Sequence, residues 1–338
     1  MIFNHVAIEG LAIIEAPHRI TSAQIEHRIG LHGEEIGIRP GLIKMLTGVV
    51  ARRFWDEGVM PSEVATMAAE KVLAETGIPR DKIGVIINTS VCRDYLEPSV
   101  ASIVHGRLEL ATHCLNFDVS NACLAFLNGM VIASNMIERG QIDYALIVDG
   151  EGSRRVIEST IARLQKNNST SQDLRDDFAT LTLGSGAAAM ILCRDDMATT
   201  THRFRGGVSL AASEWNHLCR GDEERMVTDA SQLLKAGVAL ARQTWSLATD
   251  VLAWRQDDLD ELILHQVGSI HMRTLLEELQ LPEQRAFVTY SEYGNIGPAA
   301  IPFTLAKSRD AGRVFEGDRI ALMGIGSGLN CAMMEIIW

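Results

Sequence analysis

The chain alternates between short, uninterrupted apolar runs and longer segments with helical periodicity. Residues 83–88 (IGVIIN) and 145–149 (ALIVD) form runs typical of strands that are buried on both faces of a sheet. Residues 122–139 and 61–76 predict helices, because helix-forming side chains fill both segments and a glycine follows each end. Strands that alternate with helices in this way predict an α/β fold.

The same order of elements occurs twice along the chain, at low sequence identity. In each half a middle strand runs into a turn with Gly or Ala and then into a helix, SNACLAFLNGM in the first half and YGNIGPAAIPFTL in the second. The strands are predicted to open at residues 81–83, 117–119 and 143–145, and again at 259–262, 287–289 and 317–320. This repeat indicates two similar halves, residues 1–195 and 207–338, with the polar segment 151–177 inserted as a surface helix and loop.

Composition and charge narrow the class of protein to which the chain can belong. With 47% apolar and 22% charged residues the chain is an ordinary globular sequence, and no apolar run approaches the ~18 residues of a membrane span. The N-terminal stretch lacks the basic start of a signal peptide and predicts a first strand. A net charge of −12 argues against nucleic acid as a partner. The six cysteines form no CxxC pair or metal-ligand cluster, so we expect a reduced, cytoplasmic protein without a metal site.

Cys123 is the first candidate for chemistry. The stretch FDVSNACLAF places it one residue inside the predicted helix, after the possible N-caps Ser120 and Asn121. A helix N-terminus stabilises a thiolate, so this position suits a nucleophile. The alternative is a small buried helix residue, which describes most free cysteines.

Three further positions become interesting only in combination. His265 follows the apolar run 262–264, at the end of a strand where open α/β sheets bind ligands, although a structural histidine is the alternative. Asn295 lies in YGNIGP, which also describes an ordinary turn. Glu97 precedes Pro98 in the loop RDYLEPS and is a solvated loop residue unless that loop enters a site.

A glycine-rich segment, Gly324 to Gly328, follows the apolar run 320–323. Its spacing is not GxGxxG and too little chain follows for a helix, which argues against dinucleotide binding. The glycines predict a backbone that passes close to a reacting centre. LGSGAA at residues 183–188 has the same composition.

Taken together, these segments resemble the thiolase superfamily, in particular its ketoacyl synthase III-like branch. DVSNACLAF (118–126) is similar to the nucleophile motif of that branch, LILHQV (262–267) to its histidine motif and YGNIGPAAIP (293–302) to its asparagine motif. LGSGAAAMIL and MGIGSGLNCAM resemble its glycine-rich core segments. NTSVCRDYLEPSVASIV and EWNHLCRG further resemble the members that condense two acyl-CoA molecules head to head in long-chain olefin biosynthesis.

The resemblance implies a five-layered αβαβα thiolase fold, a homodimer and a non-decarboxylative Claisen condensation of two fatty acyl-CoA molecules, with no cofactor. It implies that Cys123 carries the first acyl group, and that backbone N–H groups of Cys123 and of the loop with Gly326 and Ser327 bind the oxyanion. His265 and Asn295 then stabilise the enolate of the second substrate. The glutamate that matches Glu97 is the family's base and comes from the partner subunit.

Two alternatives remain open at this point. One is a decarboxylative ketoacyl synthase III-type enzyme with a malonyl donor, which needs no base, and the other is a catalytically silent partner that keeps the fold. A degradative thiolase is disfavoured, because Met323-Gly324 stands where that class has a second catalytic cysteine. Candidates for contacts with CoA are Arg52, Arg53 and Arg220.

Overall fold

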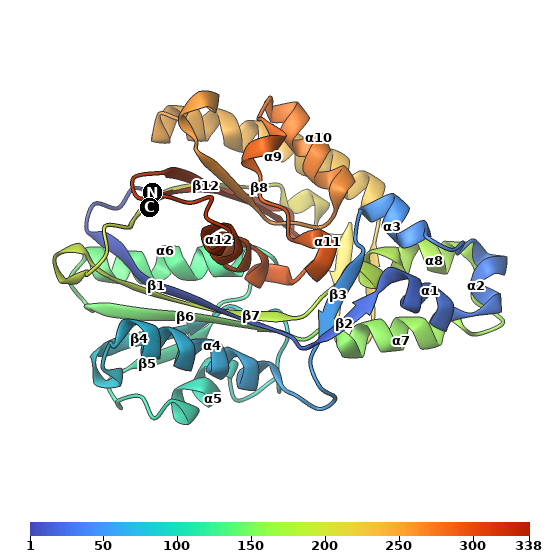
Figure 1. Cartoon of the computed structure of the whole chain (residues 1–338), viewed down its shortest axis with the longest axis horizontal. Coiled ribbons are helices and arrows are strands. Elements are labelled where there is room, and N and C mark those ends of the chain that lie inside the picture. The colour runs from blue at the N-terminus through green and yellow to red at the C-terminus, as the bar shows by residue number, and fades with distance from the viewer.

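The computed structural model describes residues 1–338. Nine of its strands follow one another through hydrogen-bonded neighbours. Strands β1 and β8 pair at only one position, Ala7 opposite Arg203, so the strands divide into two sheets in separate layers (Figure 1). The first sheet contains, in order, β5 (Leu115–Asp118), β4 (Ile83–Asn88), β6 (Tyr144–Glu151), β7 (Gly186–Arg194) and β1 (Val6–Glu15). The second contains β8 (Arg203–Ala211), β13 (Asn330–Ile337), β12 (Arg319–Gly326) and β11 (Glu261–Leu264).

Helices fill the space between the two sheets and cover both outer faces (Figure 1). The outer pairs are α4 (Pro61–Thr76) with α5 (Val100–Arg107), and α9 (Ala230–Leu252) with α10 (Ser269–Leu279). The middle layer contains α6 (Ala125–Glu138) and α12 (Ala300–Asp310). Separate apolar clusters fill the interfaces, and the largest lies in the middle and includes Phe126 and Phe303. The predicted five-layered αβαβα architecture is therefore confirmed.

Local sequence accounts for where these helices begin and end. Helix α4 has the predicted bounds, because Pro61 suits a first helical position and Gly77, at φ +68°, ends the helix with its N–H on the carbonyl of Leu73. Helix α6 begins three residues later than predicted. The preceding residues form a tight turn in which Ala122 has φ +45° and Leu124 N–H donates to the carbonyl of Asn121 at 3.0 Å.

The two halves differ at their predicted middle strands. In the first half β5 ends, rather than opens, at the predicted residues 117–119. In the second half residues 287–289 form no strand, and only a single bridge joins Ala286 to Leu262. The reason is the Gln266 side chain, which donates to the carbonyl of Phe287 at 2.5 Å and accepts from the N–H of Thr289 at 2.8 Å. A buried amide thus replaces the missing strand pairing.

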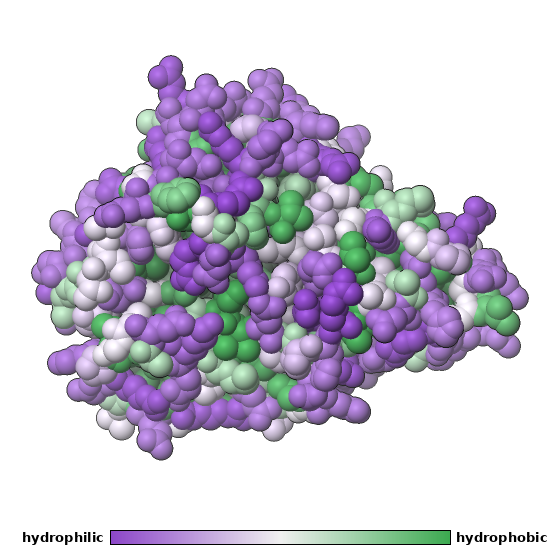
Figure 2. Space-filling view, viewed as in Figure 1, coloured by the Kyte–Doolittle hydropathy of each residue, from purple (hydrophilic) through white to green (hydrophobic).

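A smaller helical cap packs beside the layers and carries the segment predicted as a surface insertion. The cap contains α1 (Ser22–Ile29), α2 (Leu31–Ile36), α3 (Leu42–Thr47), α7 (Arg154–Leu164), α8 (Ser171–Asp177), the β2 (His18–Thr21)–β3 (Ala51–Phe54) hairpin and the β9 (Cys219–Gly221)–β10 (Met226–Thr228) hairpin. The segment 151–177 therefore forms two helices with their own apolar cluster, not one helix and a loop. On the face drawn in Figure 2 hydrophilic residues predominate. None of the helices has both the length and the apolar character needed to cross a bilayer.

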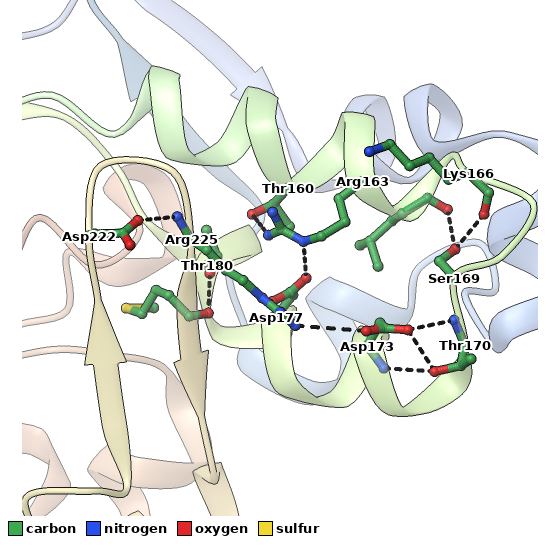
Figure 3. Close-up of polar contacts among 12 residues, drawn as sticks. Thr160, Arg163, Lys166, Ser169, Thr170, Asp173, Asp177, Thr180, Asp222 and Arg225 are labelled. Atoms are coloured by element: carbon green, nitrogen blue, oxygen red, sulfur yellow. Dashed lines mark hydrogen bonds and ion pairs between the residues drawn. The ribbon is translucent and has the colours of Figure 1, made fainter.

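A buried carboxylate holds this cap together. Asp177, fully buried at the end of α8, accepts hydrogen bonds from Nε of Arg163 on α7 at 2.8 Å and from Nε of Arg225 in the β9–β10 turn at 2.9 Å (Figure 3). The hairpin belongs to the second half of the chain and the two helices to the first. The ion pairs therefore join the two halves of the chain.

Candidate active site

Cys123 lies in the turn that joins β5 to the middle-layer helix α6. The residue is half-buried and precedes the first residue of α6 by two positions, so it is not inside the helix as predicted. An isolated bridge between Asn121 and Cys123 and the positive φ of Ala122 define the turn.

Burial opposes ionisation of the Cys123 thiol, whereas the sequence predicts a stabilised thiolate. Burial raises its pKa to about 12, and the neighbouring Cys219 and Glu151 add to the shift. Cys123 must therefore lose its proton as it attacks, so the reaction depends on stabilisation of the oxyanion that forms.

Close backbone contact brings the glycine-rich end of β12 against the nucleophile turn. A Cβ atom on Gly324 would lie 2.5 Å from Cδ2 of Leu124, and a Cβ on Gly326 would lie 3.4 Å from the backbone nitrogen of Cys123. Nδ2 of Asn330 donates to Oδ1 of Asn121 at 3.1 Å and ties the two segments together. Gly326 therefore lies beside Cys123, as predicted, and the half-buried Ser327 follows it in the same loop.

His265 reaches this place from the end of β11. Its backbone N–H donates to the backbone carbonyl of Met323 at 2.8 Å. Its Cβ lies 3.8 Å from the position that a Cβ on Gly324 would occupy. Burial lowers the pKa of the imidazole to about 4, and the neighbouring His271 contributes to the shift. At neutral pH the ring is uncharged, and its one N–H can still donate a hydrogen bond to a substrate oxygen.

Asn295 is held by its backbone and by its side-chain carbonyl. Its backbone N–H donates to the backbone carbonyl of Thr182 at 2.9 Å, and its backbone carbonyl accepts from the N–H of Gly184 at 2.8 Å. Its Oδ1 accepts from the N–H of Gly297 at 3.0 Å. Gly184 must be glycine, because a Cβ there would lie 1.8 Å from the carbonyl oxygen of Tyr293. The second glycine-rich motif, around Gly184, thus serves to position Asn295.

Glu97 is not part of the same cluster. It is exposed in the loop between β4 and α5 and has no hydrogen-bond partner, while the adjacent Tyr95 and Leu96 are 58% and 93% exposed. Within one subunit these contacts place Cys123, Gly326 and His265 beside one another, Asn295 is held in its own turn by Thr182, Gly184 and Gly297, and Glu97 lies on the surface.

The arginine candidates for CoA contacts separate in the structure. Arg52 is fully buried, where its Nη2 donates to the carbonyl of Leu181 at 2.5 Å and its Nη1 to Oγ of Ser22 at 3.1 Å, so it is structural and the expectation for it was wrong. Burial lowers the pKa of Arg52 to about 10. Arg53 is half-buried with its guanidinium 5.4 Å from the ring centroid of Tyr293. Only Arg220 is exposed, on β9.

Sequence reasoning missed two buried acids beside the nucleophile. Asp149 and Glu151 occupy the last positions of β6 and are 0% and 5% exposed. The signal was present, because the apolar run 145–148 continues directly into Asp-Gly-Glu. Acidic side chains at the carboxyl end of a buried parallel strand point to a site rather than to a solvated face.

Comparisons with known proteins agree with this geometry. Residues 117–205 match the family model of 3-oxoacyl-[acyl-carrier-protein] synthase III, and residues 250–338 match the model of its C-terminal part. The chain is 48% identical to an acyl-CoA:acyl-CoA alkyltransferase of Xanthomonas campestris and 36% identical to one of Shewanella oneidensis, with 100% of each chain covered in both cases. A β-ketoacyl-[acyl-carrier-protein] synthase III of Bacillus pumilus is 26% identical over 88% of this chain and 89% of the relative.

Solved structures give the same assignment. Cerulenin-bound OleA of X. campestris superposes with a TM-score of 0.98 at 48% identity and covers 100% of this chain and 98% of that one. Variants of that OleA have been solved in which a cysteine, a glutamate or a histidine is replaced. The chain belongs to the ketoacyl synthase III-like branch of the thiolase superfamily, in the family of the OleA acyl-CoA:acyl-CoA alkyltransferases.

Proposed function

We propose that this enzyme joins two fatty acyl-CoA molecules by non-decarboxylative Claisen condensation and forms a 2-alkyl-3-ketoacyl product for hydrocarbon biosynthesis. The observation that carries the proposal is the contrast between its relatives. Identity is 48% over the full length to an acyl-CoA:acyl-CoA alkyltransferase but 26% to a ketoacyl-carrier-protein synthase.

The first half-reaction transfers an acyl group to Cys123. The sulfur attacks the thioester carbonyl of the first acyl-CoA, the thiol proton leaves with the CoA thiolate, and a Cys123 thioester remains. The N–H groups of Cys123 and of Gly326 or Ser327 stabilise the tetrahedral oxyanion. The close approach of the β12 end to the nucleophile turn supports this role.

The second half-reaction forms the carbon–carbon bond. The thioester oxygen of the second acyl-CoA accepts hydrogen bonds from neutral His265 and from Nδ2 of Asn295, and Glu97 takes an α-proton. The enolate attacks the Cys123 thioester, the C–S bond breaks, and the released thiolate regains a proton as Glu97 gives one up. A malonyl-using enzyme needs no such base, because loss of CO₂ generates its carbanion.

The role of Glu97 requires a homodimer in which each subunit contributes this residue to its neighbour. Its surface position, beside the exposed Tyr95 and Leu96, supports delivery to another subunit rather than to its own site. The two halves, residues 1–195 and 207–338, would then build the rest of each site together. Six free cysteines suit a reducing compartment such as the cytoplasm.

The direct test supplies purified protein with a long-chain acyl-CoA as sole substrate and measures free CoA and condensed product. We expect both to form without a malonyl thioester, and Cys123→Ser to abolish both. Condensation that requires malonyl-CoA or a malonyl carrier protein would overturn the proposal in favour of a decarboxylative synthase. Absence of both reactions would favour a silent partner.

A further inference from the structure

Two buried carboxyl groups lie where the candidate site meets the loop that carries Glu97. Asp149 and Glu151 are two residues apart on β6, so their side chains leave the same face of the sheet. Ile147 lies on the same face of β6 and packs in the apolar cluster of the middle layer. This face is therefore the inner one. Neither carboxyl takes part in the mechanism described above.

Glu151 holds the first residues of the Glu97 loop. Its Oε1 accepts from the N–H of Val91 at 2.6 Å and its Oε2 accepts from the N–H of Cys92 at 3.3 Å. These two residues open the segment 91–98, whose other end enters α5. Backbone donors that point at one carboxylate fix the direction in which a loop leaves a sheet.

The same carboxyl also touches the turn that orients Asn295. Gly297 has φ +58°, and a Cβ there would lie 3.3 Å from Cδ and 3.5 Å from Oε1 of Glu151. Gly297 is the residue whose N–H fixes Oδ1 of Asn295. One side chain therefore contacts both the root of the Glu97 loop and the support of an enolate donor.

Asp149 lies beside Glu151 on the same face of β6. Its Oδ2 accepts from Oγ1 of Thr89 at 2.6 Å, while its Oδ1 is buried without a hydrogen-bond partner. Burial and the neighbouring Glu151 raise the pKa of Asp149 well above its usual range. The hydrogen-bond donors to Glu151 are the two backbone amides of the loop.

We propose that Glu151 is a positioning residue for the condensation half-reaction. It sets the loop that carries Glu97 and the turn that carries Asn295 in fixed relation to each other. The proposal rests on the function assigned above. Because Glu97 acts in the neighbouring subunit, Glu151 contacts both the Asn295 turn of its own active site and the loop that carries the base of the neighbouring active site.

The test uses Glu151→Gln in the full-length protein. In this variant the NH₂ group of the new amide faces one of the two backbone N–H donors, so one of the two hydrogen bonds is lost. Hydrogen exchange followed by mass spectrometry on peptides covering residues 89–99 should show exchange about tenfold faster than in wild type. Acylation of Cys123 should not fall, because loss of the Glu151 charge lowers the pKa of the thiol, while condensation should fall at least about tenfold.

Glu261→Gln is the matched control, because Glu261 is also a buried strand glutamate but binds Ser308 and Arg313 away from the site. It should lower stability without separating the two half-reactions. Unchanged exchange at residues 89–99 in Glu151→Gln, or equal loss of both half-reactions, would overturn the proposal. If the wild-type protein condenses no acyl-CoA, the proposed function fails, and the exchange measurement still decides whether Glu151 holds the loop.

Discussion

The N–H of Gly297 donates to Oδ1 of Asn295 at 3.0 Å. This contact decides the orientation of the side-chain amide, because the oxygen is occupied and Nδ2 is left to face a substrate. Asn295 therefore contributes a donor whose direction is set before the second acyl-CoA arrives, at no cost of reorganisation during the reaction.

Replacement of Asn295 by Asp keeps the acceptor for Gly297 and removes the donor. We expect condensation to fall ~10²–10³-fold, because one enolate donor is lost and a carboxylate oxygen faces the developing negative charge. Release of one CoA per site in the acylation burst should persist. Stopped-flow detection of free thiol separates the two steps, and a burst that disappears together with turnover would count against this division of labour.

Alkylation kinetics test the protonation state of Cys123. Since burial raises its pKa to about 12, the thiolate fraction should grow about tenfold per pH unit across pH 7–9. The rate of iodoacetamide labelling of the Cys123 peptide, measured by mass spectrometry, should rise in proportion. A rate that levels off below pH 8 would mean that the thiolate already exists at rest.

Asp177 provides a stability test within the cap. Asp177→Ala leaves Arg163 and Arg225 without their buried partner and should lower the free energy of unfolding by ~2–4 kcal/mol. Arg155 and Glu223 form a second pair between α7 and the β9–β10 turn, but both are exposed. Arg155→Ala should therefore change stability by less than ~0.5 kcal/mol in the same urea titration. Equal effects of the two variants would deny Asp177 its structural role.

Mixed subunits test the origin of the base. Glu97→Gln and Cys123→Ala proteins should each be inactive in condensation, whereas subunit exchange between them should restore part of the activity. Mixed dimers then hold one site with an intact Cys123 and a Glu97 from the other subunit. If exchange is demonstrated by differently tagged subunits and no activity returns, Glu97 serves its own subunit or has no catalytic role.

Periodicity and glycine placement were sufficient to predict much of the fold. Buried strands such as β4 and β6 are continuous apolar runs, and Pro61 and Gly77 delimit α4, so local sequence and tertiary structure agree there. The prediction failed at residues 287–289, where the distant Gln266 side chain replaces strand pairing. A long-range contact of this kind leaves no periodic signal.

The site was predictable where motifs carry it and not where burial decides. Cys123, His265 and Asn295 stand in recognisable motifs. Burial of Arg52 and the raised pKa of Cys123 depend on packing between segments far apart in the chain, so neither could be deduced from neighbours in sequence. Asp149 and Glu151 were missed because their burial depends on how β6 packs between the layers, which is decided by segments far away in the chain.

An isotope competition tests the central claim most directly. The purified enzyme receives acyl-CoA with a uniformly ¹³C-labelled acyl chain together with an excess of unlabelled malonyl-CoA, and the condensed product is analysed by mass spectrometry. If both halves of the product come from acyl-CoA, every carbon of its skeleton carries ¹³C. A product with unlabelled carbon at the donor end would show that malonyl-CoA supplies the carbanion, and would contradict the non-decarboxylative condensation.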